Sequence, residues 1–292
     1  MQDQASKLRN ITNKRIGSNK PPLSRVLAVT SGKGGVGKSN ISTNIALAMV
    51  QHGKRILLMD FDLGLANIDV LFGIYPQYTL KDVFRGKKEL KDIIVEGPEG
   101  LMIIPASSGV EEMVNLSNSQ KERLTRDVGR IKDGIDMVII DTGSGIYSDV
   151  VRMLVAANEI LIVVTPEPTS ITDAYAVIKV VSKYKKQPRI RLIVNMCRNI
   201  TDATSTGKRI TEAAKRFLGV DIQEVFAVPF DQHVSSAVRM QKPFLLQFPN
   251  AVVSTNIRKI AGNILSAQSG VCGQQDDDVV GIDRYFQSLM NL

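Results

Sequence analysis

Short, continuous runs of apolar residues alternate along the chain with longer segments that carry an apolar face at helical spacing. The continuous runs suit strands that are covered on both faces, and they span 25–30, 55–60, 101–105, 136–141, 159–165, 190–196 and 223–228. The helix-like segments include 119–132, 148–157, 170–184 and 206–218. The third of these starts with the pattern of a capping box, Ser170-Ile171-Thr172-Asp173. This alternation predicts an α/β fold with a doubly wound, mostly parallel sheet flanked by helices.

Residues that can carry chemistry fall where the predicted strands end. They are Gly32, Asp60, Asp141, Asn195 and Pro229. Ligands of doubly wound sheets bind beyond the carboxyl ends of the strands. Because 292 residues suffice for one sizeable α/β domain with short appendages, the pattern predicts one binding site along this edge.

Residues 32–39 read G-K-G-G-V-G-K-S and satisfy the phosphate-loop pattern G-x-x-x-x-G-K-[ST], between a predicted strand and a helical segment at 40–50. In such a loop, backbone N–H groups and the positive end of a helix face an anion. Lys38 is expected to bind the β- and γ-phosphates, and Ser39 to place its hydroxyl on Mg²⁺. The residues expected to contact the nucleotide here are Gly32, Gly34, Gly35, Val36, Gly37, Lys38, Ser39 and Asn40.

A second cation, Lys33, lies in the same loop between Gly32 and Gly34. Because Lys38 already serves the phosphates that this chain binds, Lys33 has two interpretations. It is either a solvated surface lysine or a lysine that crosses to the phosphates of a partner subunit.

The loop K-G-G-V-G-K-S resembles the deviant Walker A loop of the MinD/ParA ATPases, in which the first lysine reaches across an ATP-sandwich dimer. Other motifs of this P-loop NTPase family follow in order. The segment 60–69, D-F-D-L-G-L-A-N-I-D, is similar to switch I of MinD, and 141–145, D-T-G-S-G, stands at the position of switch II. MinD proteins usually have Pro-Ala where this chain has Gly143-Ser144, which is expected to leave the switch backbone less constrained. The resemblance predicts a MinD-like ATPase domain over 24–268.

The resemblance implies slow ATP hydrolysis that depends on dimerisation, with ATP and Mg²⁺ bound. Lys33 would supply positive charge from the partner subunit to the transferred phosphate, beside Lys38 of the chain that binds the nucleotide. Asp62 would orient the attacking water, and Asp60 would support the metal shell or the switch. For this pair, the plainer interpretation is two strand-end or cap carboxylates. Asp141 would be an outer-shell partner of the metal that the Ser39 hydroxyl contacts.

The same resemblance implies an adenine side formed by Asn195, Pro229 and Asp231, at the ends of two predicted strands. ATP is expected rather than GTP, because Asn195 can serve the adenine edge and the chain has no N-K-x-D guanine motif.

Composition limits the remaining classes of function. No apolar run reaches the ~18–20 residues of a spanning helix, and the chain starts with no apolar signal segment, so we expect a cytoplasmic protein. Cys197 and Cys272 form no C-x-x-C, which argues against a zinc or iron–sulfur site. The net charge of +8 would suit DNA or acidic lipid, although its clusters at 7–25 and 183–191 are more commonly solvated faces.

Residues 281–292 carry an apolar stripe at helical spacing, after an acidic linker at 269–280. The stripe consists of Ile282, Tyr285, Phe286, Leu289 and Met290. A packed terminal helix gives the same pattern, but the linker and the MinD resemblance favour an amphipathic membrane-targeting helix. One copy would bind an anionic membrane marginally, whereas two copies on an ATP-held dimer would act together. We therefore expect peripheral association with the inner face of the cell membrane.

Residues 1–23 form a basic leader before the first predicted strand. Its segment 3–9, D-Q-A-S-K-L-R, resembles the D-Q-A-x-x-L-R element of the FlhG (YlxH/FleN) branch of MinD-like ATPases. In that branch the element acts on FlhF, the signal-recognition-type GTPase that places the flagellar basal body. The residues that would activate this partner are Asp3, Gln4, Ala5, Leu8 and Arg9. The plainer interpretation is an unstructured leader, but a tethered activator that folds on binding has the same composition.

The combined hypothesis is a dimerising membrane switch that limits flagellar number and stimulates FlhF, with no specific nucleic acid as partner. A ParA-type DNA-partitioning ATPase is the alternative that the basic clusters favour. A MinD-type regulator of the division site differs from the first hypothesis only in the leader. A metal-carrier enzyme on the same scaffold would need paired cysteines, which this chain lacks.

Overall fold

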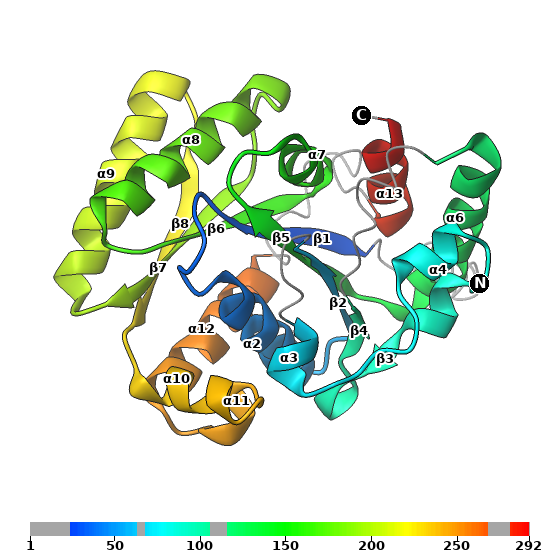
Figure 1. The fold of residues 1–292 in the computed structure, drawn as a ribbon. Coiled ribbons are helices and arrows are strands. Elements are labelled where there is room, and N and C mark those ends of the chain that lie inside the picture. The colour runs from blue at the N-terminus through cyan, green and yellow to red at the C-terminus, as the bar shows by residue number, and fades with distance from the viewer. Residues whose placement is uncertain (1–23, 63–67, 106–115, 268–280, 292) are drawn as a thin grey trace, which may run out of the picture.

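The computed structural model describes residues 24–62, 68–105, 116–267 and 281–291. The predicted leader, with Asp3, Gln4, Ala5, Leu8 and Arg9, and the predicted linker at 269–280 lie outside these residues. An eight-stranded sheet has the strand order β3-β4-β2-β5-β1-β6-β7-β8 (Figure 1). All neighbouring strands are parallel except β3, which is antiparallel to β4. The strands are β1 (Arg25–Ser31), β2 (Ile56–Phe61), β3 (Val95–Glu96), β4 (Met102–Ile104), β5 (Met137–Ser144), β6 (Glu159–Val164), β7 (Ile190–Cys197) and β8 (Ile222–Pro229).

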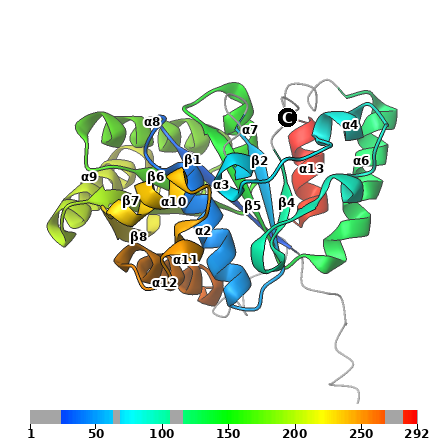
Figure 2. The same cartoon turned by 60° about the horizontal axis from the view of Figure 1, so that its bottom comes forward.

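Helices cover both faces of the sheet (Figures 1 and 2). The helices form one layer on each face of the sheet, and successive residues of a strand point to opposite layers. In β1, Leu27 and Val29 pack with the first layer, and Val26 and Ala28 pack with the second. The first layer holds α2 (Lys38–Gln51), α3 (Ile68–Phe72), α10 (Gln232–Arg239), α11 (Phe244–Gln247) and α12 (Val252–Ser266). The second holds α4 (Leu80–Phe84), α6 (Asn118–Ile131), α7 (Ser148–Ala156), α8 (Pro168–Tyr184), α9 (Ile200–Leu218) and α13 (Ile282–Asn291). The predicted doubly wound, mostly parallel architecture is therefore confirmed.

Each of the seven predicted strands is present, and among the described residues the two-residue β3 is the one strand that the pattern did not indicate. The predicted capping box at Ser170 is wrong. Helix α8 begins at Pro168, with Glu167 as its N-cap, because a proline in the first turn already has helical φ and needs no N–H partner. The Ser170 hydroxyl instead accepts a hydrogen bond from the backbone N–H of Thr165 at 3.0 Å, which fixes the connection from β6 to α8.

The C-terminal helix α13 forms as predicted, but its apolar face is not free. Tyr285 and Phe286 are fully buried, and the rest of the stripe, Ile282, Leu289 and Met290, is buried with them. The helix lies between α6 and α7, within the apolar cluster of the second layer (Figure 1). The expectation of a detached helix is thus corrected for this conformation, and its contact with a membrane stays a prediction. None of the described helices is long and apolar enough to span a membrane.

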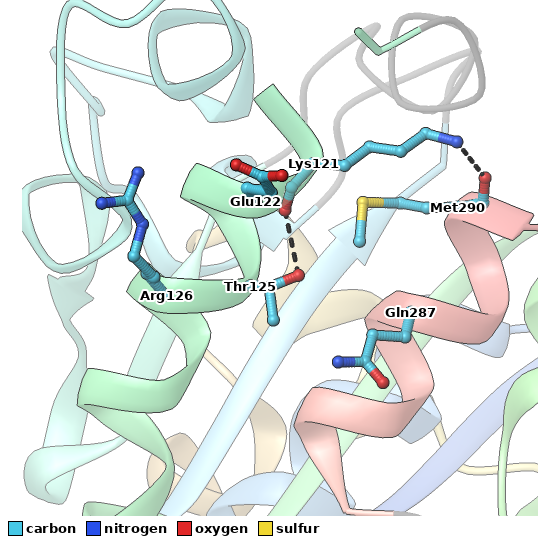
Figure 3. A pocket seen from close by; sticks show the side chains of 6 residues that line it. All are labelled: Lys121, Glu122, Thr125, Arg126, Gln287 and Met290. Carbon is cyan, nitrogen blue, oxygen red and sulfur yellow. Dashed lines mark hydrogen bonds between the residues drawn. The ribbon is translucent and has the colours of Figure 1, made fainter. Parts of the chain in front are cut away.

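Polar contacts hold α13 at both ends. The Lys121 ammonium on α6 donates to the backbone carbonyl of Met290 at 2.7 Å, where the last carbonyls of a helix lack internal partners (Figure 3). At the first turn, Lys132 lies 3.3 Å from the Asp283 carboxylate. These contacts fix the position of a helix whose packing is otherwise apolar.

One buried group in this packing has no partner: the Tyr285 hydroxyl lacks a hydrogen bond among the described residues, and burial raises the pKa of this phenol above its usual value. A buried hydroxyl without a partner costs about 1–3 kcal/mol. We therefore expect Tyr285→Phe to raise stability by about 1 kcal/mol, which for a chain of this size is about 2–4 °C in Tm.

Thermal unfolding of the nucleotide-free protein tests this expectation. The matched control is Tyr184→Phe, because Tyr184 is exposed and its hydroxyl is solvated in either state. A lower Tm for Tyr285→Phe than for the control would show that the hydroxyl is paired.

Candidate functional site

The phosphate loop joins the end of β1 to the start of α2, so its backbone N–H groups are presented at the carboxyl edge of the sheet. Gly35 and Gly37 have φ of 81° and 88°, the left-handed region in which a side chain is disfavoured. At Gly32, a Cβ atom would lie 2.3 Å from the backbone carbonyl carbon of Asp173, so only glycine fits there. Gly34 is exposed and Val36 is buried, so one part of the loop faces solvent while another packs against the domain.

Lys38 lies beneath this loop as a buried cation. Its ammonium is 2.9 Å from Asp141 Oδ1, 3.5 Å from Asp62 Oδ2 and 3.4 Å from Ser39 Oγ. Burial alone would lower the pKa of Lys38, but the charges of Asp141, Asp62 and Asp60 outweigh it and raise the pKa above its usual value. The sheet produces this arrangement, since β5 lies between β1 and β2 and pairs Asp60 with Asp141. The lysine is therefore held charged where phosphate oxygens would bind.

The two aspartates at the end of β2 differ in their surroundings. Asp60 is buried, and its carboxylate accepts from the backbone N–H groups of Asp62 at 3.0 Å and Ile68 at 3.2 Å. It therefore ties together the two described ends of the predicted switch I. The Asp62 side chain is partly exposed, at 22%, and faces Lys38. This geometry agrees with the predicted support role of Asp60 and leaves the water-orienting role of Asp62 as a prediction.

Lys33 is held within its own chain. Its ammonium lies 2.5 Å from Glu167 Oε2 and 3.2 Å from Thr169 Oγ1, at the start of α8. Both charged side chains are substantially exposed, at 32% for Lys33 and 62% for Glu167. Glu167 and Thr169 were not among the predicted site residues, although the segment T-P-E-P-T follows directly after β6 and so lies at the same edge.

The predicted switch II segment is part of the sheet in this conformation. Strand β5 continues through Ser144, which pairs with Ser31, and the N–H of Gly145 donates to the Ser31 carbonyl at 2.8 Å. A Cβ on Gly143 would lie 3.4 Å from Val150 Cγ2, which is an ordinary van der Waals contact. In this conformation the segment is thus held in the sheet, and the expected loosening of the backbone at Gly143-Ser144 stays a prediction.

The residues predicted for the adenine side have structural partners of their own. Asn195 donates from Nδ2 to the Val36 carbonyl at 2.8 Å. Pro229 ends β8, and Asp231 caps α10 by accepting from the His233 N–H at 3.0 Å and, through its second oxygen, from the Val253 N–H at 3.3 Å. Burial would raise the pKa of Asp231, but these hydrogen bonds outweigh it and lower the pKa. Direct contact of these residues with a base stays a prediction.

The donor set fits Mg²⁺ bound together with a nucleotide. The second oxygen of Asp141, Oδ2, is buried and has no hydrogen-bond partner among the described residues. The part of the chain that the structure describes contains no group of three His, Cys, Asp or Glu side chains that could bind a metal by themselves. Mg²⁺ in nucleotide sites is bound by one or two protein ligands, with phosphates and water supplying the rest. Ser39 and Asp141 are the residues that would hold it.

Known proteins resemble this chain in both sequence and structure. Residues 24–194 match the family described as AAA domain. The antiactivator FleN of Pseudomonas aeruginosa is 42% identical over 251 residues, 86% of this chain and 89% of FleN. The flagellum site-determining protein YlxH of Helicobacter pylori is 34% identical over 295 residues, 99% of each chain. The septum site-determining protein MinD of Pyrococcus horikoshii, complexed with Mg-ADP, has the same fold, with a TM-score of 0.69 at 22% identity over 87% of this chain and 100% of MinD.

Three observations indicate the same family. They are the phosphate loop with its additional Lys33, the aspartates at the strand ends and the similarity to these relatives. The chain belongs to the MinD/ParA family of P-loop ATPases, in the branch that FleN and YlxH represent.

Proposed function

We propose that the protein is an ATP-hydrolysing switch that is active as a homodimer. The observation that carries this proposal is the buried, charged Lys38 beneath the phosphate loop, with the carboxylates of Asp141 and Asp62 beside it. Mg-ADP in the structure of MinD from Pyrococcus horikoshii supports ATP and Mg²⁺ as the ligands. Bound Mg²⁺ would neutralise phosphate charge. Asp62 orients the attacking water, and Asp60 holds the backbone on both sides of the predicted switch I in place.

A second copy of the chain fits the edge that carries the site. Large apolar side chains are exposed just beyond the strand ends there: Ile146 at 50%, Tyr147 at 76% and Phe230 at 62%. A sandwich of two copies through this edge would cover them and would bring Lys33 of each chain to the nucleotide of the other. Lys33 must first leave Glu167. Because an exposed ion pair contributes only about 0–1 kcal/mol, this exchange costs little.

The relatives favour flagellar regulation as the process that the switch controls. FleN is described as an antiactivator and YlxH as a flagellum site-determining protein. The similarity to YlxH extends over 99% of this chain, including the residues before β1 and after α12. We infer a role in flagellar number and placement, with an FlhF-type GTPase stimulated through Asp3, Gln4, Ala5, Leu8 and Arg9. A ParA-type DNA-partitioning ATPase and a MinD-type regulator of the division site are the alternatives.

Membrane association, on this proposal, is peripheral and requires α13 to leave the domain. Its five apolar side chains are buried in the conformation described here, so they contact lipid only after release. ATP-dependent dimerisation would then present two helices to an anionic inner membrane surface, where effective concentration makes two weak anchors act as one stronger anchor.

Lys33 and Asp62 are predicted to act at different steps. Lys33→Ala should retain ATP affinity but lose hydrolysis by about 10³-fold or more, because a cation supplied in trans stabilises charge at the transferred phosphate. Asp62→Ala should bind ATP and remain dimeric without turnover. Nucleotide affinity, turnover and size-exclusion chromatography in ATP separate the two variants, with Asp221→Ala, remote at the amino end of β8, as control. A monomeric Asp62→Ala in ATP would contradict the assignment.

Flotation with anionic liposomes tests the membrane switch. We expect the full chain to float in ATP and to remain soluble in ADP, because α13 is released only in the dimer. A chain that ends at Gln274 should stay unbound in both nucleotides. Neutral liposomes are the control for charge dependence. Equal flotation of the full chain in ATP and ADP would contradict nucleotide control, and binding by the shortened chain would assign the membrane contact to another surface.

The leader separates the flagellar proposal from the division-site alternative. Deletion of residues 1–20 should abolish stimulation of FlhF GTPase while leaving the protein's own ATPase unchanged, because the deleted residues precede the described domain. Gln4→Ala in the full chain is the matched point variant. Full stimulation by the shortened chain would remove the main support for FlhF as the partner, and retention of DNA in ATP would favour the ParA-type alternative.

A further inference from the structure

We propose that the groove between α6 and α7, which α13 fills in this structure, is a docking site for an amphipathic helix of a partner protein. The inference rests on the proposed function, because the groove becomes free only when α13 moves to a membrane. It names an occupant for the surface that the moving helix leaves behind. It follows from the wall of the groove, from its rim and from the fit of α13.

The wall of the groove is apolar. Leu124 and Val128 of α6 and Met153 and Leu154 of α7 belong to the buried cluster that also holds the stripe of α13. Once the stripe has moved to lipid, these two helices face water unless another apolar surface covers them. A contiguous apolar patch on a protein surface marks a site of interaction. The departure of α13 therefore creates a docking surface.

The proposed dimer excludes its own C-terminal helices as the new occupant. Both copies of α13 would lie in the membrane at the same time, so neither could cover the groove of the other chain. The groove is shaped for a helix, because α13 occupies it as a helix over Ile282–Asn291. Grooves of this kind bind helices with apolar side chains at i, i+3, i+4 and i+7. A helix from another protein is therefore the occupant that fits.

Two lysines at the rim specify the charge and direction of that helix. Lys132 lies 3.3 Å from the carboxylate of Asp283, in the first turn of α13. Lys121 donates to the carbonyl of Met290 at 2.7 Å, in the last turn, where carbonyls lack partners within the helix. A positive charge is also favourable at the end of a helix where carbonyls point. The groove thus fits a helix that carries an acidic residue in its first turn and runs in the direction of α13.

The fit of α13 is incomplete in two places. The Tyr285 hydroxyl is buried with no hydrogen-bond partner among the described residues, so phenylalanine would pack there without that loss. Beside the last turn, a pocket of about 650 Å³ opens between α6 and α13 (Figure 3). Its lining consists of Lys121, Glu122, Thr125, Arg126, Gln287 and Met290. A helix that removes the first defect or fills the second would bind more tightly than α13 does.

The test uses the full chain, with a synthetic peptide in place of the unidentified partner. The peptide has the sequence of residues 281–292 with Arg284→Gln, which removes its trypsin site, and Tyr285→Phe, which removes the unpaired hydroxyl. Trypsin should cut the protein after Arg284 only when α13 has left the groove, because a docked helix is protected. Mass spectrometry measures the rate at which the fragment 285–292 is released.

The peptide should accelerate this cleavage, because it keeps the released helix from returning. At ten times its dissociation constant, the rate should rise about tenfold. A peptide that retains the tyrosine should need about five times the concentration for the same rate, as expected for one unpaired buried hydroxyl. A peptide of the same composition in scrambled order should leave the rate unchanged.

A charge exchange at the rim separates docking from a general effect of an apolar peptide. Asp283→Lys in the peptide should lower the acceleration several-fold, because two cations then meet at the rim. Lys132→Glu in the protein should restore the acceleration for that peptide, relative to the cleavage of the same variant without peptide. Lys179→Glu, at an exposed position on α8, is the matched control and should restore nothing.

Acceleration that depends on the apolar order and on the rim charge would support the inference. No acceleration, or equal acceleration by the scrambled peptide, would overturn it. Rapid cleavage without peptide would show that the groove is stable when empty, which would also overturn it. A rate that falls as the protein concentration rises would assign the groove to a second copy of this chain instead. Should Lys132→Glu not fold, the tyrosine-containing and scrambled peptides decide.

The outcomes also distinguish the inference from the proposed function. The cleavage experiment contains neither nucleotide nor lipid, so its result depends on the groove alone. The proposed function fails separately, if the full chain shows no flotation that depends on ATP. Peptide docking without such flotation would leave the groove as a helix-binding site that α13 closes, with the membrane switch disproved.

Discussion

The buried ion pair between Lys38 and Asp141 is the interaction on which the rest of the site depends. Asp141 is fully buried, and a buried charge is stable only with a partner of opposite charge. The pair forms because β1 leads into the helix that begins with Lys38, while the neighbouring β5 ends at the same edge. Strand β2, on the other side of β5, adds the aspartates at 60 and 62. Parallel pairing of three strands thus gathers one cation and three carboxylates beneath a loop that binds anions.

The two lysines of the loop pair with carboxylates in different environments. The pair of Lys38 is buried, and the pair of Lys33 is near the surface, so the first is expected to be more persistent than the second. Lys38 is 7% exposed, and loss of its partner would leave a buried charge uncompensated. Lys33 pairs with Glu167 near the surface, where solvent and salt weaken the attraction. One cation of the loop is therefore fixed by a buried pair, whereas the other is held by an exposed pair, as the proposed exchange of Lys33 requires.

Sequence patterns predicted the sheet, the phosphate loop and the strand-end aspartates, because each follows from local periodicity or from a motif of adjacent residues. The Asn195 contact with Val36 and the Glu167 contact with Lys33 were missed. Both join residues more than a hundred positions apart and depend on the order of strands. The position of α13 was missed for another reason. A helix that packs on a core and a helix that binds a membrane need the same apolar stripe, so the pattern cannot distinguish them.

Docking of α13 between α6 and α7 has a consequence for the energetics of the proposed switch. The stripe itself exchanges one apolar environment for another when the helix moves from the core to lipid, whereas the apolar faces of α6 and α7 that it covered would become exposed. Between them, five large side chains would meet water, at about 1.5–3 kcal/mol each. The intermediate, rather than either end state, is then the costly species. The balance of such a switch depends on what offsets the uncovered faces of α6 and α7, while its speed depends on how long the apolar face of α13 is exposed to water during the transfer.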